Sequence, residues 1–520
     1  MANFNFKINT VLPGHTSSDY FYQEGQFQNS IGIDPEMGVS DSTTKPCGLL
    51  RPTSMVKFSG TEITGVPMHI IPNTKTGDSY VYANDGKVHT VASDLTMGTA
   101  LNSGTALTTA SANGASYYNN YAYFAKNTDI ARYGPLDGSA TLVQNFWTST
   151  LSLTALANKT YPEINGIKIP NHPMHVHTAN NRLYFGDVNS DGIGILSMIK
   201  TKKVTVEGDT NDTVIPSAYN VLDTYYNWYP TCINSLGNEL AVGLIDGTNT
   251  TVKQANAKVI FWSTVASDTS YNRIAELPDP LVTAMKNVNG ILYVFSGSAQ
   301  GGMRISRYLG GQSFEEVYYA PDQYPPFQGA VDYVLNRITW GNKTSVPSVS
   351  GSVFALGSKS RALAMGIHNI LKSTSAGTNP LVTCVKYLKQ GATEQPIIGW
   401  TDGSAKGLDK LSTTYRSATF RSQLYPVGSK GQINEIRIPL AVALGANMTI
   451  TVKVYMDDGS SSKTLQEINA TNFPGDRRCI EIKDIMANFD NNFYIEFVWS
   501  GTALCPIALP IQILGNTLND

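Results

Sequence analysis

The sequence predicts an all-β protein: a six- or seven-bladed β-propeller followed by a C-terminal antiparallel β-sandwich, with an extended N-terminal arm. Charged residues are 15% of the 520 residues, against roughly 25% in an average globular protein. Ser, Thr, Asn and Gly take their place, which favours strands and turns over helices. A two-strand unit recurs at intervals typical of a propeller blade, roughly 40 to 50 residues. From residue 406 onward, apolar residues alternate strictly along single strands instead.

The repeated unit is clearest at residues 180–196. Leu183-Tyr184-Phe185 forms one strand and Ile193-Gly194-Ile195-Leu196 the next. The Asn, Asp and Gly residues between them tolerate the left-handed backbone that a hairpin needs. The same pattern predicts further strand pairs at 79–83 with 87–91, 121–125 with 130–133, 239–243 with 258–262, 290–295 with 303–308, and 336–340 with 352–356.

The spacing of these units sets the predicted domain boundaries. The first-strand centres lie 41, 61, 58, 51 and 45 residues apart, so we expect a propeller over residues 61–405 with loop insertions in the longer units. A weaker seventh unit uses segments 363–370, 381–388 and 396–400. A strand within residues 51–58 is expected to close the ring against the last blade.

The two ends of the chain have different patterns. Residues 1–60 show no sustained periodicity and are predicted to be an extended arm, which lies on its own domain or on a neighbouring subunit. Residues 406–520 contain alternating rows such as Ile436, Ile438 and Leu440, and are predicted to form a sandwich of the jelly-roll or immunoglobulin-like kind. Pro506 and Pro510 predict that the last strand is an edge, because proline cannot donate to a β-ladder.

Charge and cysteine usage exclude several classes. The net charge of −2 gives no overall basic field for nucleic acid. The five cysteines are scattered with no CxxC pair, so buried free thiols are preferred to a zinc site or a disulfide framework. No apolar run suggests a signal peptide or a membrane-spanning helix. We therefore expect a soluble protein that is made in the cytoplasm and is not exported by the general secretory route.

One turn resembles the first half of a calcium loop. Asp187, Asn189 and Asp191 place oxygen side chains two residues apart, and Gly192 follows at the sharp turn. Position twelve of such a loop should be a bidentate Glu but is Met198, which excludes an EF-hand. Calcium at Asp187, Asn189 and Asp191 is therefore one hypothesis, and no cofactor is otherwise expected. The alternative is a polar hairpin whose side chains cap their own backbone.

A histidine cluster precedes this turn. His175 and His177 point to one face of a predicted strand, with His172 nearby. Such spacing suits two metal ligands, but no neighbouring carboxylate completes the set. Ordinary hydrogen bonding within the strand is the preferred interpretation.

Signatures of catalysis are missing from the sequence. There is no Gly-x-Ser-x-Gly elbow and no phosphate loop. Propeller glycosidases need two carboxylates that converge from different blades. Asp129, Asp187, Asp246 and Asp332 are candidates, although any propeller has such residues. We therefore predict a protein that is not an enzyme.

The layout as a whole resembles the virion structural proteins of tailed bacteriophages that are built on a propeller, such as tail-hub, neck, nozzle or ring proteins. The features that carry the resemblance are Gly48-Leu49-Leu50-Arg51-Pro52, the Leu-Tyr-Phe type of blade strand, and the closing segments Tyr415–Tyr425, Gly431–Ile438 and Thr449–Gly459. The resemblance implies a ring of identical copies around a DNA channel. It further implies neighbouring tail or neck proteins as partners, passive contact with translocating DNA, and location in the virion.

Two other function classes remain open. A carbohydrate- or host-receptor-binding propeller would use aromatic surfaces such as Tyr225-Tyr226-Asn227-Trp228-Tyr229 to stack on sugar rings. Packing of these aromatic residues between blades is the preferred explanation of the same segment. A propeller glycoside hydrolase is the third class.

Overall fold

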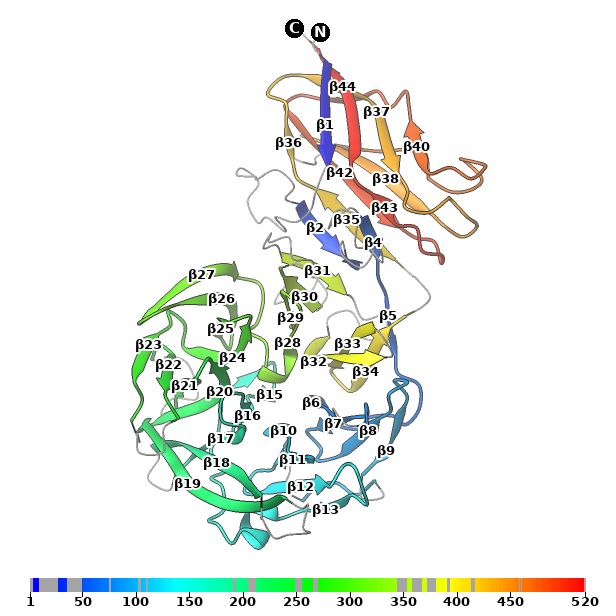
Figure 1. Cartoon of the computed structure of the whole chain (residues 1–520). Helices are drawn as coiled ribbons and strands as arrows, with labels where there is room; N and C mark the ends of the chain where they lie inside the picture. The colour runs from blue at the N-terminus through cyan, green and yellow to red at the C-terminus, as the bar shows by residue number, and fades with distance from the viewer. Residues whose placement is uncertain are drawn as a thin grey trace.

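The computed structural model is almost entirely β-sheet (Figure 1). Short helical segments are the π-helical turn η2 (Phe146–Thr150) and the 3-10 turn η3 (Gln328–Ala330). No helix in the described part of the chain is long and apolar enough to cross a membrane. The structure describes residues 3–8, 27–34, 49–73, 76–101, 104–108, 111–189, 193–203, 212–247, 255–264, 270–343, 353–357, 367–371, 380–390, 393–412, 417–457, 459 and 461–518.

Seven four-stranded antiparallel sheets among the described residues surround a common centre, as in a β-propeller (Figure 1). We call this part the ring of sheets. The first three sheets are β6 (Pro67–Pro72), β7 (Ser79–Ala83), β8 (Val88–Val91) and β9 (Met97–Ala100); β10 (Gly114–Tyr118), β11 (Tyr121–Ala125), β12 (Ile130–Gly134) and β13 (Thr141–Val143); and β16 (Met174–His177), β17 (Arg182–Val188), β18 (Ile193–Lys203) and β19 (Asp212–Tyr226).

The fourth and fifth sheets are β20 (Trp228–Leu236), β21 (Glu239–Asp246), β22 (Lys258–Trp262) and β23 (Arg273–Glu276); and β24 (Leu281–Val288), β25 (Ile291–Ser298), β26 (Gly301–Gly310) and β27 (Ser313–Ala320). The last two are β28 (Val331–Val334), β29 (Arg337–Gly341), β30 (Val353–Leu356) and β31 (Ile367–Leu371); and β32 (Leu381–Gln390), β33 (Thr393–Asp402), β34 (Ala405–Leu411) and β5 (Met55–Lys57). A small hairpin, β14 (Glu163–Ile164) with β15 (Ile167–Lys168), lies between the second and third sheets in the chain.

The strand pairs predicted from the sequence are the second and third strands of six of these sheets. The registers Tyr82↔Val88 and Leu240↔Trp262 illustrate this agreement. Turns into the second strands use asparagine with positive φ, for example Asn120 at +70° and Asn181 at +49°. Asparagine tolerates this left-handed backbone, which explains why asparagine marks these turns in the sequence.

A strand from near the N-terminus completes the last sheet. β5 pairs with β34, with Met55 opposite Leu411, which confirms the predicted closing strand. The boundaries predicted at 60/61 and 405/406 are therefore wrong, because β5 and β34 both belong to the ring of sheets. The predicted seventh unit also needs correction: β31 (Ile367–Leu371) pairs with β30 in the sixth sheet.

The remaining strands form a terminal module from both ends of the chain (Figure 1). Its sheets have the orders β1-β44-β37-β40, with β41 on β37, and β2-β35-β42-β38-β39, with β36 on β42; a smaller sheet is β3-β4-β43. Their bounds are β1 Asn3–Ile8, β2 Phe27–Ile31, β3 Ile33–Asp34, β4 Leu49–Pro52, β35 Ala418–Ser422, β36 Tyr425–Pro426, β37 Gly431–Pro439, β38 Ile450–Met456, β39 Ser461–Thr464, β40 Cys479–Ile482, β41 Ala487–Phe489, β42 Asn492–Trp499, β43 Ile507–Ala508 and β44 Ile511–Thr517.

The described part of residues 1–60 is therefore not a separate extended arm. β1 pairs with β44, β2 pairs with β35, and β4 pairs with β43. The predicted last strand is divided into two: β43 ends the order β3-β4-β43, whereas β44 lies between β1 and β37 and is not an edge. Pro506 and Pro510 fall outside β44, so they cost it no ladder hydrogen bond.

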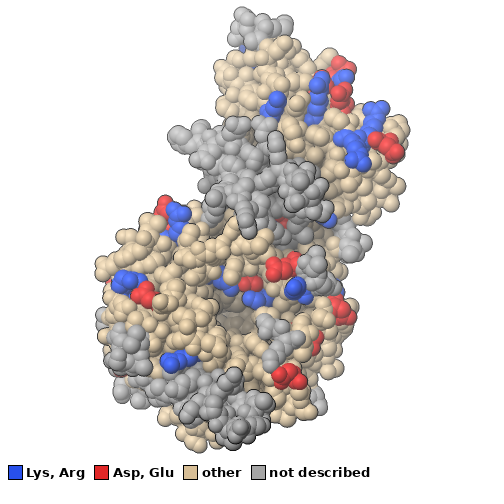
Figure 2. Space-filling view, viewed as in Figure 1, with Lys and Arg blue, Asp and Glu red and all other residues tan. Residues whose placement is uncertain are grey.

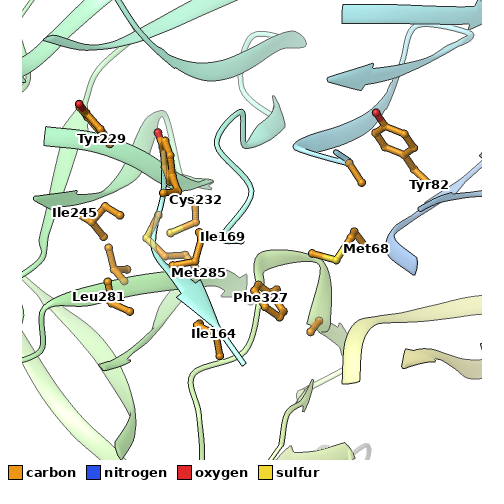
Figure 3. Close-up of a cluster of buried hydrophobic side chains, with 14 of the residues drawn as sticks. Met68, Tyr82, Ile164, Ile169, Tyr229, Cys232, Ile245, Leu281, Met285 and Phe327 are labelled. Atoms are coloured by element: carbon orange, nitrogen blue, oxygen red, sulfur yellow. The ribbon is translucent and has the colours of Figure 1, made fainter. Parts of the chain in front are cut away.

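Each part has its own hydrophobic core. A cluster of buried residues that includes Phe27, Ile436 and Trp499 joins the two larger sheets of the terminal module. In the ring of sheets, buried side chains from several sheets pack together around Met285 and Phe327 (Figure 3). Sheet faces that cover one another in this way remove apolar surface from water, which is the main favourable term in folding.

A buried ion pair connects the two parts. Arg337 on β29 donates two hydrogen bonds to the carboxylate of Asp34 on β3, at 3.1 and 3.0 Å. Their side chains are 0% and 1% exposed. The partners are 303 residues apart in sequence, so the pair fixes the N-terminal segment against the sixth sheet.

Candidate functional site

The centre of the ring of sheets contains a cavity of about 520 Å³. The seven four-stranded sheets of the described chain each contribute lining residues from the strand nearest the centre. One from each, in chain order, is Ile70, Ala115, His175, Ser235, Lys286, Tyr333 and Lys386. Figure 2 shows a hollow at this position, with basic and acidic side chains gathered beside it. A closed radial arrangement brings residues together here that are far apart in the chain.

Two lysines and one aspartate form the charged part of this site. Lys286 Nζ on β24 lies 2.9 Å from Asp332 Oδ1, and Lys386 Nζ on β32 lies 3.1 Å from the same oxygen. The other carboxylate oxygen of Asp332 accepts a hydrogen bond from the backbone N–H of Tyr387 at 3.0 Å. Because β28 lies between β24 and β32 around the ring, its aspartate receives a cation from each neighbouring sheet.

The electrostatics of the site follow from burial and from these contacts. Burial opposes ionisation of Asp332, but Lys286 and Lys386 together hold the pKa of its carboxyl well below the usual range. Burial lowers the pKa of the Lys386 ammonium, while Asp332 raises it in part. Asp332 is thus a carboxylate near neutral pH, and it compensates one of the two positive charges.

The two histidines of the lining are neutral near pH 7. Burial lowers the pKa of His175 to about 3, helped by the nearby Lys286 and His177. Burial also lowers the pKa of His69 to about 4, although its Nε2 lies 2.9 Å from the carbonyl oxygen of Ala112. Uncharged imidazoles here avoid a further unfavourable positive charge beside the lysines.

The histidine cluster predicted from sequence is divided between two environments. His175 Nε2 and His177 Nδ1 lie 2.7 and 2.9 Å from Ser235 Oγ, so these two rings point to one face, as expected. His172 is elsewhere, with its two ring nitrogens 3.2 Å from the carbonyl oxygens of Gly186 and Asn127. All three histidines have hydrogen-bond partners, and these partners are Ser235, Gly186 and Asn127 rather than residues of the histidines' own strand.

The predicted calcium residues are only partly described. Asp187 lies on β17 and is fully buried; its Oδ1 accepts a hydrogen bond from Ala157 N at 3.0 Å and lies 3.6 Å from His172 Nδ1. Burial raises the pKa of Asp187, and His172 opposes this shift. Asn189 follows β17, whereas Asp191 is outside the described residues. Across the described part of the chain, no group of three or more potential ligands is placed to hold a metal ion.

The four carboxylates considered for glycoside hydrolysis do not converge. Asp129 accepts hydrogen bonds from the backbone N–H groups of Trp147 and Thr148, and Asp246 is the last residue of β21. Asp187 lies 3.6 Å from His172 Nδ1, whereas Asp332 contacts Lys286 and Lys386, which line the cavity. Among the described lining residues there is no carboxylate, so a glycosidase pair is not assembled in this cavity.

The aromatic run Tyr225–Tyr229, considered as a sugar-binding surface, has side chains in different environments. Tyr229 is buried and packs against Tyr161 in a tilted arrangement, with ring centroids 5.6 Å apart. Trp228 packs under Lys258 Nζ, which lies 4.4 Å from its ring centroid. Tyr226 remains 66% exposed. Packing therefore accounts for part of the segment and leaves one exposed ring.

Sequence reasoning missed Lys286 and Lys386. Lys286 is the single lysine of β24, and Lys386 follows the mainly apolar run Leu381-Val382-Thr383-Cys384-Val385 of β32. A lysine is almost never buried without a partner, so this interruption was an available signal. Its partner, Asp332, was considered only as a catalytic carboxylate.

Comparisons with known proteins add little to this picture. No protein-family model matches the chain, and no curated protein matches it. Among solved structures, a computationally designed protein, Ika8, is similar with 11% identity and a TM-score of 0.37, over 69% of this chain and 99% of that one. The Cps50 (Swd1) β-propeller domain of Myceliophteria thermophila is similar with 9% identity and a TM-score of 0.40, over 68% of this chain and 99% of that one.

Proposed function

We propose that this protein is a non-enzymatic structural component of a bacteriophage virion, located in the tail or the head-to-tail neck. In this proposal the seven sheets are the blades of a seven-bladed propeller, and the two larger sheets of the terminal module form a sandwich. Identical copies assemble into a ring around the DNA channel, next to other tail or neck proteins. Support comes from the sequence resemblance and from the way the chain connects its two parts.

The observation that carries the proposal is the path of the N-terminal segment. β1, β2 and β4 pair with strands of the terminal module, and β5 then completes the last sheet of the ring. The Arg337–Asp34 pair adds a buried contact along the same path. Two parts connected by strands and by a buried ion pair suit a rigid mechanical component, because relative motion would break backbone hydrogen bonds.

The geometry of the central cavity is consistent with a role other than catalysis. The Asp332 carboxylate beside the cavity accepts hydrogen bonds from two lysines. The two histidines of the lining lie within hydrogen-bond distance of Ser235 Oγ and of the Ala112 carbonyl oxygen. A general acid or base works best with a pKa near the operating pH, whereas burial moves the pKa of His175 to about 3 and that of His69 to about 4.

Imaging of the purified full-length protein tests the proposal. Negative-stain microscopy should show closed rings, and an antibody against the protein should label the tail or neck of phage particles. The proposal fails if the protein stays monomeric at high concentration and is absent from particles.

A carbohydrate- or receptor-binding role is the second candidate. The observation in its favour is a set of exposed tyrosines: Tyr226 is 66% exposed, Tyr319 45% and Tyr333 42%. Exposed aromatic rings supply flat apolar faces that suit sugar rings. Glycan-array binding that is lost in Tyr226→Ala or Tyr333→Ala would favour this role over a purely structural one.

A further inference from the structure

The central cavity has an unbalanced positive charge. Its described lining includes two cations, Lys286 and Lys386, and no anion. Asp332 lies beneath them and supplies one negative charge, while the pKa values of His69 and His175 keep these rings neutral. One positive charge therefore remains in a partly buried space, where Coulomb interactions are much stronger than in bulk water.

The two ammonium groups are held close together. Both contact the same oxygen, Asp332 Oδ1, at 2.9 and 3.1 Å, so their nitrogens are at most about 6 Å apart, a distance at which like charges repel strongly. Each ammonium has three N–H donors and uses one on Asp332. Their side chains are 18% and 27% exposed, so solvent and small solutes reach them.

Polar side chains around the lysines are fixed in position. Asn234 Nδ2 donates to the Met285 carbonyl oxygen at 3.0 Å, and Asn287 Nδ2 donates to the Ser235 carbonyl oxygen at 2.7 Å. Each amide has a second N–H for another acceptor. Donors that are already ordered lose little entropy when a ligand binds. The volume of about 520 Å³ is in the usual range for a small-molecule site.

We propose that this cavity is a binding site for a small oxyanion, a molecule that carries a carboxylate or phosphate group. The oxyanion accepts hydrogen bonds from the ammonium groups of Lys286 and Lys386 and compensates the second positive charge. Asp332 sets the strength of binding, because it neutralises one ammonium and positions both. The proposal is independent of any assembly into rings.

Calorimetric titration of the full-length protein with inorganic phosphate and with malonate, at constant ionic strength, tests the site. We expect saturable binding of at least one probe. Lys286→Met and Lys386→Met should each weaken it at least about tenfold, since each removes a charge-assisted hydrogen bond. Asp332→Asn should strengthen it, because the negative charge that competes with the oxyanion for both ammonium groups is gone. Lys168→Met, which removes an exposed lysine on β15, is the matched control and should bind as the wild type does.

The lysine variants should bind the probe more weakly and the aspartate variant should bind it more tightly, and this difference distinguishes a charge effect from a general loss of structure. Thermal unfolding of each variant establishes that it is folded, and Asp332→Asn tests the charge argument even if one lysine variant does not fold. Absence of saturable binding of both probes to the wild type would overturn the proposal. Equal affinities of Lys286→Met, Asp332→Asn and the wild type would overturn it as well.

Discussion

The buried Arg337–Asp34 pair offers the sharpest test of how the two parts of the chain are connected. Arg337→Met keeps an unbranched side chain of similar length but removes the guanidinium that faces the Asp34 carboxylate. Both side chains are essentially inaccessible, at 0% and 1% exposed, and two hydrogen bonds join them. Breaking such a pair by removing one partner costs about 3–5 kcal/mol, because a buried charge is left uncompensated.

A second pair in the same ring of sheets gives the matched control. Arg307 and Glu315 also form an ion pair, but their side chains are 37% and 47% exposed. Water replaces the lost partner there, so Arg307→Met should cost at most about 1 kcal/mol. The double variant Asp34→Asn/Arg337→Met removes both buried charges and should recover part of the loss from Arg337→Met alone.

Urea unfolding followed by tryptophan fluorescence measures these effects, because Trp340 on β29 and Trp499 on β42 are buried in the cores of the two parts and become exposed to water on unfolding. In Arg337→Met we expect a clearly lower unfolding midpoint. The explanation is refuted if Arg337→Met and Arg307→Met shift the midpoint equally, or if the double variant is no more stable than Arg337→Met.

Three further predictions concern ring closure, pH and calcium. Met55→Ala on the closing strand should lower the free energy of unfolding by about 2–5 kcal/mol, because Met55 is fully buried against residues such as Trp400. The neighbouring Val56→Ala, at a 36% exposed site, should change the free energy of unfolding in chemical denaturation by less than about 0.5 kcal/mol. Equal effects of the two variants would contradict the role of β5 in closing the ring of sheets. On folding, the pKa of His175 falls from 6.5 to about 3 and that of His69 to about 4, so the unfolded state takes up protons first and stability should decline as pH falls from 6.5 toward 4. The melting temperatures of His175→Gln and His69→Gln should decline less across this pH range than the melting temperature of the wild type. Parallel curves would refute the low pKa values of these two histidines. Calcium should not raise the melting temperature, because Asp187 is buried and its Oδ1 already accepts from Ala157; a rise that is lost in Asp187→Asn would restore the calcium hypothesis.

Local sequence signals were sufficient for most strands of the ring of sheets. Alternating apolar and aromatic residues, separated by Asn and Gly turns, identified pairs such as β7 with β8 and β21 with β22. This works because side chains in a strand alternate between faces and because few residues tolerate positive φ. The closing strand within residues 51–58 was also predictable, since a ring of sheets leaves one edge to be filled.

Pairings across the whole chain were not predictable in the same way. Residues 1–60 read as an arm because they have no core of their own, yet β1 and β2 lie beside β44 and β35. Any exposed strand edge offers the same backbone donors and acceptors, so the choice of partner depends on which edges the rest of the fold leaves open. For the same reason, the edge predicted from proline applies to β43, whereas β44 has partners on both sides.

Strand periodicity, turn residues and composition are local properties, so the all-β class, the repeated strand pairs and the weak overall charge of this protein could be predicted before its fold was known. Tertiary structure alone decided that Lys286, Asp332 and Lys386 meet at one carboxylate oxygen and that Asp34 meets Arg337. These groups come from different strands, and their charges interact strongly only because folding places them within hydrogen-bond distance in an environment with little water. No pattern along the chain specifies such distances before the ring of sheets has closed.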